Sequence, residues 1–333
     1  MAWHRFLEPP LKVAAVHLIK MASDIILYES DDVQRPDKIN ISGPPELAAA
    51  LSEAAAARYK EKPLGIYPKK RIALTKLKNV RVSGFEPVIT PETAQPNIES
   101  AAILVQKWGY GFYHFVNEML PKILRAHEYN PKAPIITFYN DTFIKDILKF
   151  AGITNPIIPY DGQSPYIVKE ATHITDTASG NPTPSDIALI RRHLRITPAE
   201  NRDVNILIYR KESKRSISNF VEFRDTLKRH FPGKKWFVFD SLPFDAAVKL
   251  FARANLIVAA HGAGLSNMIF APQGTPIIEI SPADSFNACF WHLSWILNNP
   301  HHFLAAKSSG APFHNMEVDV KSAVALIETL SVQ

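Results

Sequence analysis

The 333-residue sequence has a single cysteine, Cys289, and no apolar run of the ~18 residues that a membrane-spanning helix needs. One cysteine excludes an internal disulfide framework and fits a reducing compartment. No signal-peptide cleavage pattern is visible either. We therefore expect no transmembrane segment and a cytoplasmic location, with loss of an anchor from a longer chain as the alternative.

Three signatures for metal or phosphate binding are also missing. The sequence has no Asp-x-Asp, a spacing that chelates a divalent cation. It has no Walker motif, and its Gly-containing turns lack the third glycine of the dinucleotide fingerprint. We expect no metal and no cofactor, so an anionic ligand must be met by basic side chains and helix N-termini.

The composition is that of a globular protein, with 46% hydrophobic and 21% charged residues. A net charge of +6 suits an anionic ligand. The basic residues are dispersed, and no groove-reading motif accompanies them, so nucleic acid is not an expected partner.

Apolar strands alternate with amphipathic helices, most clearly after residue 202, which predicts parallel sheets covered on both faces. The length favours two domains. We predict an α/β protein of two doubly wound, Rossmann-like domains that face a cleft. They would span residues 1–200 and 201–310, and a terminal helix at 311–333 would pack back on the first domain.

The stretch "HGAGLSN", His261–Asn267, follows the apolar strand "NLIVAA" and opens a short helix. Gly262 and Gly264 allow the backbone to approach an anion that a helix N-terminus attracts. The alternative is a simple strand-to-helix turn with a packed histidine.

The stretch "YRKESKRSISN" carries Arg210, Lys214 and Arg215 just beyond another strand, where basic side chains can neutralise a diphosphate. The alternative is an exposed basic loop. Glu279 lies within the apolar strand "TPIIEIS", where a carboxylate needs a partner. A ribose diol or a buried arginine would serve.

The stretch "KWGYGFYHFVNEMLPK" places His114 and Glu118 four residues apart, on one face of a helix that Pro121 should kink or split. A histidine and a carboxylate beside aromatic residues suit general-base chemistry on a sugar. The alternative is a surface His–Glu pair.

In this order, the segments "GFYHFVNEMLPK", "YRKESKRSISN", "HGAGLSNMIFAPQGTPIIEI" and "FWHLSWILN" resemble the motifs of glycosyltransferase family 61. The resemblance runs from about Lys107 to Leu297. It implies a GT-B enzyme that inverts configuration, uses a nucleotide-sugar donor (mostly UDP-linked) and needs no metal.

The resemblance also implies a role for each motif residue. Donor phosphates and sugar would be held by Arg210, Lys214, Arg215, His261, Gly262, Ala263, Gly264, Ser266 and Asn267, and the nucleotide ribose by Glu279. His114 or Glu118 would be the catalytic base, with Trp108, Tyr110 and Tyr113 binding the acceptor.

The predicted reaction moves xylose, another pentose or N-acetylglucosamine from a UDP-sugar to a hydroxyl of a glycan or glycoprotein acceptor, in a single displacement. Two alternatives remain at this point. One is a UDP-sugar epimerase-like enzyme, and the other is a non-catalytic protein that binds nucleotides or glycans.

Overall fold

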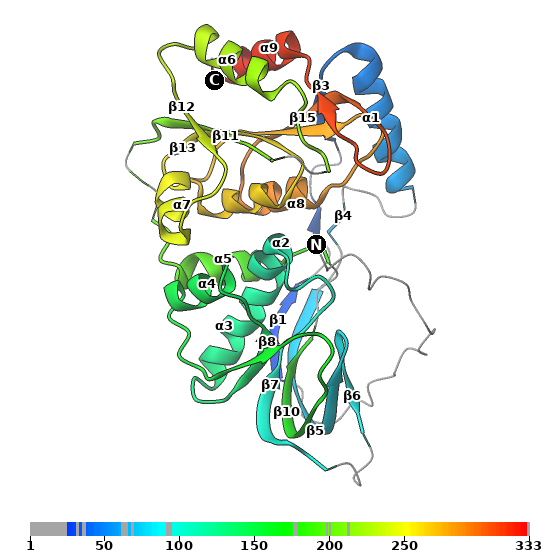
Figure 1. Ribbon diagram of the computed structural model, residues 1–333, viewed down its shortest axis with the longest axis vertical. Helices are drawn as coiled ribbons and strands as arrows, with labels where there is room; N and C mark the ends of the chain where they lie inside the picture. Colours follow the sequence, from blue (N-terminus) through cyan, green and yellow to red (C-terminus); the bar gives the residue numbers. More distant parts are fainter. Residues whose placement is uncertain are drawn as a thin grey trace.

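The computed structural model describes residues 25–30, 33–34, 38–60, 66–67, 70–90, 95–175, 179–197, 199, 201–211 and 214–331. These residues form two large sheets, one above the other, with helices between them (Figure 1). The predicted α/β class is confirmed. Within the described ranges, no helix is long and apolar enough to cross a bilayer.

The upper sheet in Figure 1 is built from the C-terminal half of the chain and has the order β12-β11-β13-β14-β15-β16. Its first five strands are parallel, and β16 is antiparallel to β15. Their bounds are β11 Val204–Ile208, β12 Lys235–Phe239, β13 Ala254–Ala260, β14 Ile277–Pro282, β15 His301–Ser308 and β16 Met316–Glu317.

Helices cover both faces of this sheet, as the continuous apolar strands predict. Helices α6 and α9 lie on the outer face, and α7, η2 and α8 lie on the face toward the lower sheet (Figure 1). The order of the first five strands is doubly wound, and its direction reverses between β11 and β13. The helix bounds are α6 Phe220–His230, α7 Phe244–Phe251, the 3₁₀ helix η2 Ala263–Phe270, α8 Cys289–Ile296 and α9 Val320–Ser331.

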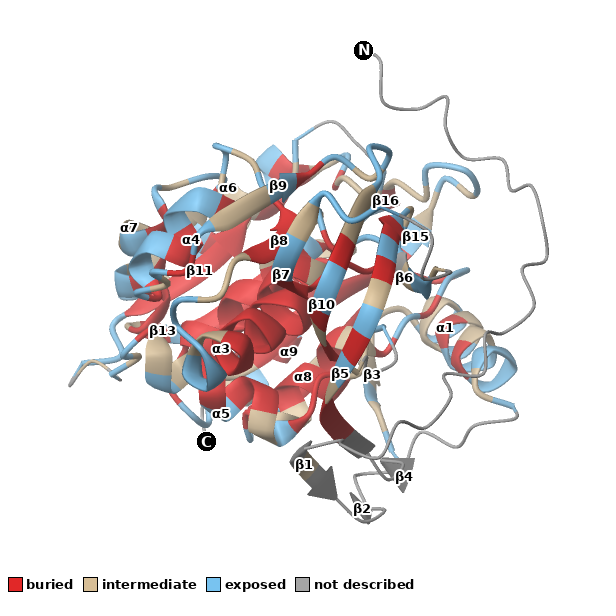
Figure 2. Ribbon diagram, turned by 90° about the horizontal axis from the view of Figure 1, so that it is seen from below, coloured by how far each residue is buried: buried red, intermediate tan, exposed pale blue. Residues whose placement is uncertain are grey.

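The lower sheet is mixed and does not follow the doubly wound pattern predicted for it. Its order is β1-β5-β10-β7-β8-β9, with β6 beside β5, and β5 runs against all three of its neighbours. Strands β5 and β10 show alternating buried and exposed bands, typical of a sheet with one covered face (Figure 2). The strands are β1 Ile25–Ser30, β5 Lys70–Ser83, β6 Glu86–Ile89, β7 Ile98–Ile103, β8 Ile135–Phe138, β9 Ile157–Tyr160 and β10 Tyr166–Ile174.

The helices of the lower sheet begin with a helical run that changes its winding. It is α-helical in α2 (Phe112–His114), π-helical in η1 (Phe115–Met119) and α-helical again in α3 (Leu120–Tyr129). Pro121 lies in the first turn of α3, where its missing N–H costs little, so the predicted interruption takes the form of a π segment. The two further helices are α4 Ile144–Phe150 and α5 Pro184–His193.

Two segments that were predicted to pack with the first domain, residues 1–200, pack with the upper sheet instead. Strand β3 (Asn40–Ser42) pairs with β15, and α1 (Pro45–Arg58) packs beside it, so this early segment belongs to the upper sheet. Helix α9 packs on α6 and the upper sheet, not on the lower one. The remaining strands, β2 (Val33–Gln34) and β4 (Ile66–Tyr67), form a separate pair.

One apolar core joins the two sheets. It includes Ile123 of α3, Ile190 of α5 and Ile269 of η2, all fully buried. Burial of this kind contributes about 25 cal/mol to the free energy of folding for each Å² of apolar surface removed from water. The two halves are therefore held against each other by packing, and the loops at the edge of the upper sheet are held over the lower one.

Candidate active site

A cavity of about 900 Å³ lies between the two halves of the molecule, a volume suited to a nucleotide-sized ligand. It opens beside the reversal point of the upper sheet, where doubly wound proteins bind their ligands. Of the predicted site residues, it is lined by Tyr113, His114, Arg215, His261, Gly262 and Ala263.

His261 follows directly on β13 and faces a carboxylate from the neighbouring strand. Its Nδ1 makes a short hydrogen bond to Glu279 Oε1, and Nε2 of His301 lies 3.1 Å from the other oxygen, Oε2. A carboxylate only accepts, so Nδ1 is the protonated nitrogen of His261 and Nε2 is the one available to a ligand.

Burial acts to raise the pKa of the Glu279 carboxyl, but the charges and hydrogen bonds of His261 and His301 outweigh it and lower that pKa to about 2. Glu279 therefore stays ionised without contact with water. Its side chain is 0% exposed, so it cannot reach the ribose that the resemblance implies. The partner is neither a ribose nor an arginine, and we replace the predicted contact with a positioning role toward His261.

Arg210 lies over the His261 turn, two residues beyond the end of β11. Its Nη1 donates to the His261 carbonyl oxygen at 3.2 Å. A Cβ on Gly262 would lie 2.0 Å from this Nη1, so the glycine is needed for the close approach of the guanidinium. A Cβ on Gly264 would similarly crowd Ile208, at 3.0 Å.

Arg215 lines the cavity, whereas Arg210 is not among the residues of the cavity wall. Its Nε is buried and has no hydrogen-bond partner among the described residues. Burial and, secondarily, the charge of Arg215 lower the pKa of Arg210. Two guanidinium groups this close repel each other, and an anion between them would relieve the repulsion. Lys214 is exposed and does not line the cavity.

The side chains of Ser266 and Asn267 do not reach the cavity. Ser266 is fully buried and accepts a hydrogen bond of 3.1 Å from Asn117 Nδ2, across the boundary between the two halves. Asn267 Nδ2 donates to the Gly264 carbonyl at 2.8 Å. Both residues therefore shape the turn and its docking, and direct contact with a donor is excluded by their burial.

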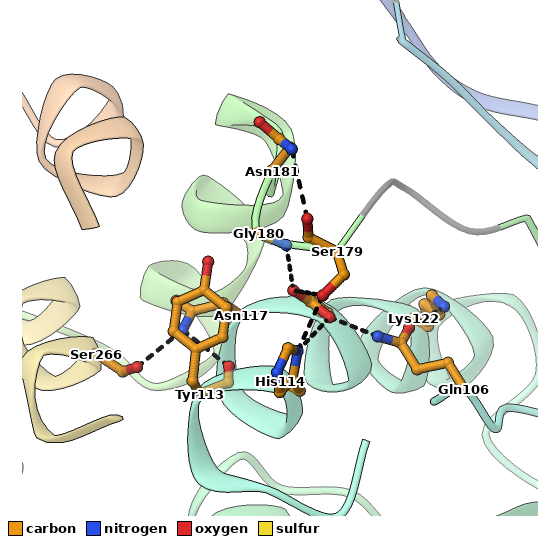
Figure 3. Close-up of polar contacts among 10 residues, drawn as sticks. Gln106, Tyr113, His114, Asn117, Lys122, Ser179, Gly180, Asn181 and Ser266 are labelled. Carbon is orange, nitrogen blue, oxygen red and sulfur yellow. Dashed lines mark hydrogen bonds and ion pairs between the residues drawn. The ribbon is translucent and has the colours of Figure 1, made fainter. Parts of the chain in front are cut away.

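On the opposite side of the cavity, four groups converge on the carboxylate of Glu118, which is 0% exposed (Figure 3). Oε2 accepts from Gln106 Nε2 at 2.5 Å and pairs with His114 Nδ1 at 2.9 Å. Oε1 accepts from the Gly180 amide at 2.8 Å and the Ser179 hydroxyl at 3.3 Å. The His114 side chain is 26% exposed and lines the cavity.

A buried lysine stands behind this pair. Lys122 Nζ donates to Gln106 Oε1 at 2.5 Å, so one amide bridges Lys122 and Glu118. Burial lowers the pKa of Lys122 to about 8, against the opposing effect of the Glu118 and Asp186 charges. The surface pair considered from sequence is thus part of a largely buried network that reaches the cavity through His114, Ser179 and Gly180.

The three aromatic residues predicted to bind the acceptor are separated. Tyr113 is buried in the cavity wall, its ring edge-on to His114 at 5.1 Å, and its hydroxyl has no partner among the described residues. Burial is the largest cause that raises its pKa. Trp108 and Tyr110 lie outside the cavity wall, in a group of rings with Phe138.

Sequence reasoning missed a third set of wall residues. They come from the end of α1, the segment before α5 and the start of α8, and only β3–β15 pairing or helix packing brings them to the cavity. These residues are Arg58, Tyr59, Lys60, Ser179, Gly180, Asn181, Asn287, Ala288, Cys289 and His292. Burial raises the pKa of the Cys289 thiol, which is unsuited to a nucleophilic role.

The model of the Glycosyltransferase 61 family matches residues 112–278, half of the chain, from α2 to β14. The chain belongs to glycosyltransferase family 61. The match includes His114, Arg210 and His261, and it confirms both the family and the enzyme class predicted from the motifs. The chain is therefore assigned to the glycosyltransferases.

Other comparisons add little. No curated protein matches the sequence. Similar solved structures include a mutant flavo di-iron protein from Thermotoga maritima, with 10% identity over 71% of this chain and a TM-score of 0.26. The chain spans 55% of that protein's length. A TM-score this low does not indicate a shared fold.

Proposed function

We propose that this family 61 enzyme transfers a sugar from a UDP-linked donor to a hydroxyl of a glycan or glycoprotein, with inversion and without a metal. The observation that carries the proposal is the shared cavity, into which His114 projects from the lower half and His261 with Arg215 from the upper half. Xylose, other pentoses and N-acetylglucosamine are the first donor sugars to test.

On the donor side, the diphosphate would lie against the Gly262–Ala263 backbone, between Arg210 and Arg215. Support comes from the position of this turn at the reversal point of a doubly wound sheet and from the unpartnered Arg215 Nε. His261, oriented by Glu279, would donate or accept at the donor through Nε2.

On the acceptor side, His114 is the proposed base. Its Nε2 takes the proton of the acceptor hydroxyl, whose oxygen attacks the anomeric carbon as the bond from that carbon to the diphosphate oxygen breaks. The leaving UDP keeps the bonding electron pair, and the two arginines stabilise its charge. One displacement inverts the anomeric centre. Glu118 holds the imidazole through Nδ1.

We propose that the two halves have the roles of the two domains of a GT-B enzyme, so that the upper half binds the donor and the lower half binds the acceptor.

Within the described ranges, no cluster of three or more His, Cys, Asp or Glu side chains is arranged for a metal ion. Metal independence rests on the two arginines as counter-charge, and activity should survive EDTA. The cytoplasmic location stays a prediction.

The deciding experiment is a screen of UDP- and GDP-sugars for binding by thermal shift and for slow hydrolysis without an acceptor. We expect stabilisation by UDP, and release of free sugar from one UDP-sugar with and without EDTA. Conversion of the nucleotide sugar to its epimer, with no free sugar, would instead support an epimerase. A chain that no nucleotide stabilises would contradict the proposal.

A further inference from the structure

The cavity carries more positive charge than a donor diphosphate requires. Besides Arg215, its wall contains Arg58 and Lys60, and none of the described residues that line it is an aspartate or a glutamate. Several cations outside the cavity form ion pairs, as in Arg253 with Asp203 and Lys169 with Glu99. Unpaired cations gathered in one cavity repel one another, which an anionic ligand would offset.

Arg58 and Lys60 are free to meet such a ligand. Within the part of the chain that the structure describes, neither exposed side chain has a hydrogen-bond, ion-pair or ring partner. The backbone that carries them is nevertheless held in place, because Tyr59 between them is anchored. The Tyr59 hydroxyl accepts a hydrogen bond of 3.0 Å from the Ala288 amide, and its ring packs edge-on against Phe286 at 5.8 Å.

The cations of the two pairs come from different segments of the chain. Arg210 follows β11 and donates to the His261 turn, and the Arg215 backbone N–H donates to the Phe313 carbonyl, shortly before β16. Arg58 and Lys60 lie at the end of α1, which packs on β15. Arg210 adjoins the turn assigned to the donor diphosphate, and the end of α1 therefore offers its positive charge to a second anionic group.

We propose that Arg58 and Lys60 form an anion subsite for the acceptor, and that the acceptor is an acidic glycan bearing a carboxylate, sulfate or phosphate group. This inference rests on the proposed transferase function and deepens it. The donor diphosphate would be held by Arg210 and Arg215, and the acidic group of the acceptor by the end of α1. His114 would then face the hydroxyl between them.

The test is calorimetric binding of matched trisaccharides to the full chain saturated with UDP. Each acidic probe is paired with its neutral counterpart: a galacturonate with its carboxyl-reduced form, a sulfated with its desulfated form, and a phosphorylated with its dephosphorylated form. We expect at least one acidic member to bind tenfold or more tightly than its neutral partner, and the pair that does so identifies the anion.

The variant is Arg58→Gln with Lys60→Gln. It should remove the preference for the acidic probe and leave the Kd of UDP within twofold. The matched control, Lys228→Gln with Lys234→Gln, removes two exposed charges near α6 and should change neither. Circular dichroism melting of both doubles verifies their folding.

Two results would overturn the subsite. One is equal binding of every acidic probe and its neutral partner by the wild type. The other is a loss of UDP affinity in the Arg58/Lys60 variant as large as in Arg210→Ala, which would make these residues donor ligands. The transferase proposal itself would be contradicted by a different result, namely that the wild type neither binds UDP nor hydrolyses a UDP-sugar.

Discussion

Nδ1 of His114 lies 2.9 Å from Oε2 of Glu118, one helical turn along the chain. The carboxylate is buried and held by three further donors, while the imidazole borders the cavity. When Nδ1 of His114 donates to Glu118, Nε2 is the nitrogen that can accept from an acceptor hydroxyl. This asymmetry supports His114, and not Glu118, as the proposed base.

His114→Ala should therefore lower kcat by about 10²- to 10⁴-fold and leave the Kd of UDP unchanged, since general-base catalysis is worth that much. His193→Ala, a histidine paired with Glu128 on the surface, is the control and should retain full kcat. Initial rates with the UDP-sugar from the screen measure both. Near-normal turnover of His114→Ala would remove the base assignment.

Arg210→Ala should weaken UDP binding by about 10- to 100-fold, because a charge-assisted contact to a phosphate is lost. Arg215→Ala should behave in the same way, and Arg229→Ala, on the exposed side of α6, should have no effect. Isothermal titration with UDP gives the three constants. Unchanged UDP affinity in both the Arg210 and the Arg215 variant would exclude a diphosphate between these two residues.

Gly262→Ala tests the close approach of Arg210 to the turn. The new Cβ would meet Nη1 at 2.0 Å, so the guanidinium must move and UDP affinity should fall about tenfold. The backbone at Gly262 is extended, with φ of 170°, so alanine adds no strain and the melting temperature should change little.

A double-mutant cycle separates this explanation from a general disturbance of the turn. In an Arg210→Ala background, Gly262→Ala should cost no further affinity for UDP. Gly233→Ala, at a position with no neighbour within 4 Å of the added Cβ, is the control. Additive losses in the cycle would show that the alanine acts on something other than Arg210.

Glu279 should make the protein sensitive to acid. Its pKa in the folded state is about 2, below the ordinary value of 4.5, so the unfolded chain binds the proton more readily. The stabilisation is present above pH 4.5 and is lost as the pH falls toward 2. Urea unfolding at pH 5 and pH 3 measures how much the free energy of unfolding falls between these pH values. This fall should be about 2 kcal/mol smaller in Glu279→Gln than in the wild type.

Lys122→Met should affect the chemistry without touching the donor. The ammonium donates to Gln106 Oε1, and Gln106 Nε2 donates to Glu118, so loss of the ammonium removes the partner that orients this amide and kcat should fall about tenfold. The Kd of UDP should not change, and Lys122→Arg should restore part of kcat. A loss of UDP affinity as large as the loss of kcat would indicate a structural role only.

The sequence predicted the upper half of the molecule well because its signals are local. Strand "NLIVAA" and the turn that follows it occur as expected, and basic residues follow β11. The lower sheet was predicted less well, since the antiparallel course of β5 depends on pairing with β10, about ninety residues later in the chain. Burial of Ser266, Asn267 and Glu279 likewise depends on the neighbouring strands and helices.

By itself, the sequence determined the family, the α/β class and some of the residues that meet across the cavity, because motifs and hydrophobic periodicity are carried by nearby residues. The tertiary structure alone decided which of them can act. Packing of the two halves buried Glu118 and Glu279 and left His114 and His261 at the cavity. Pairing of β3 with β15, about 260 residues apart, also brought Arg58 and Lys60 there, and no local pattern encodes a contact of that separation.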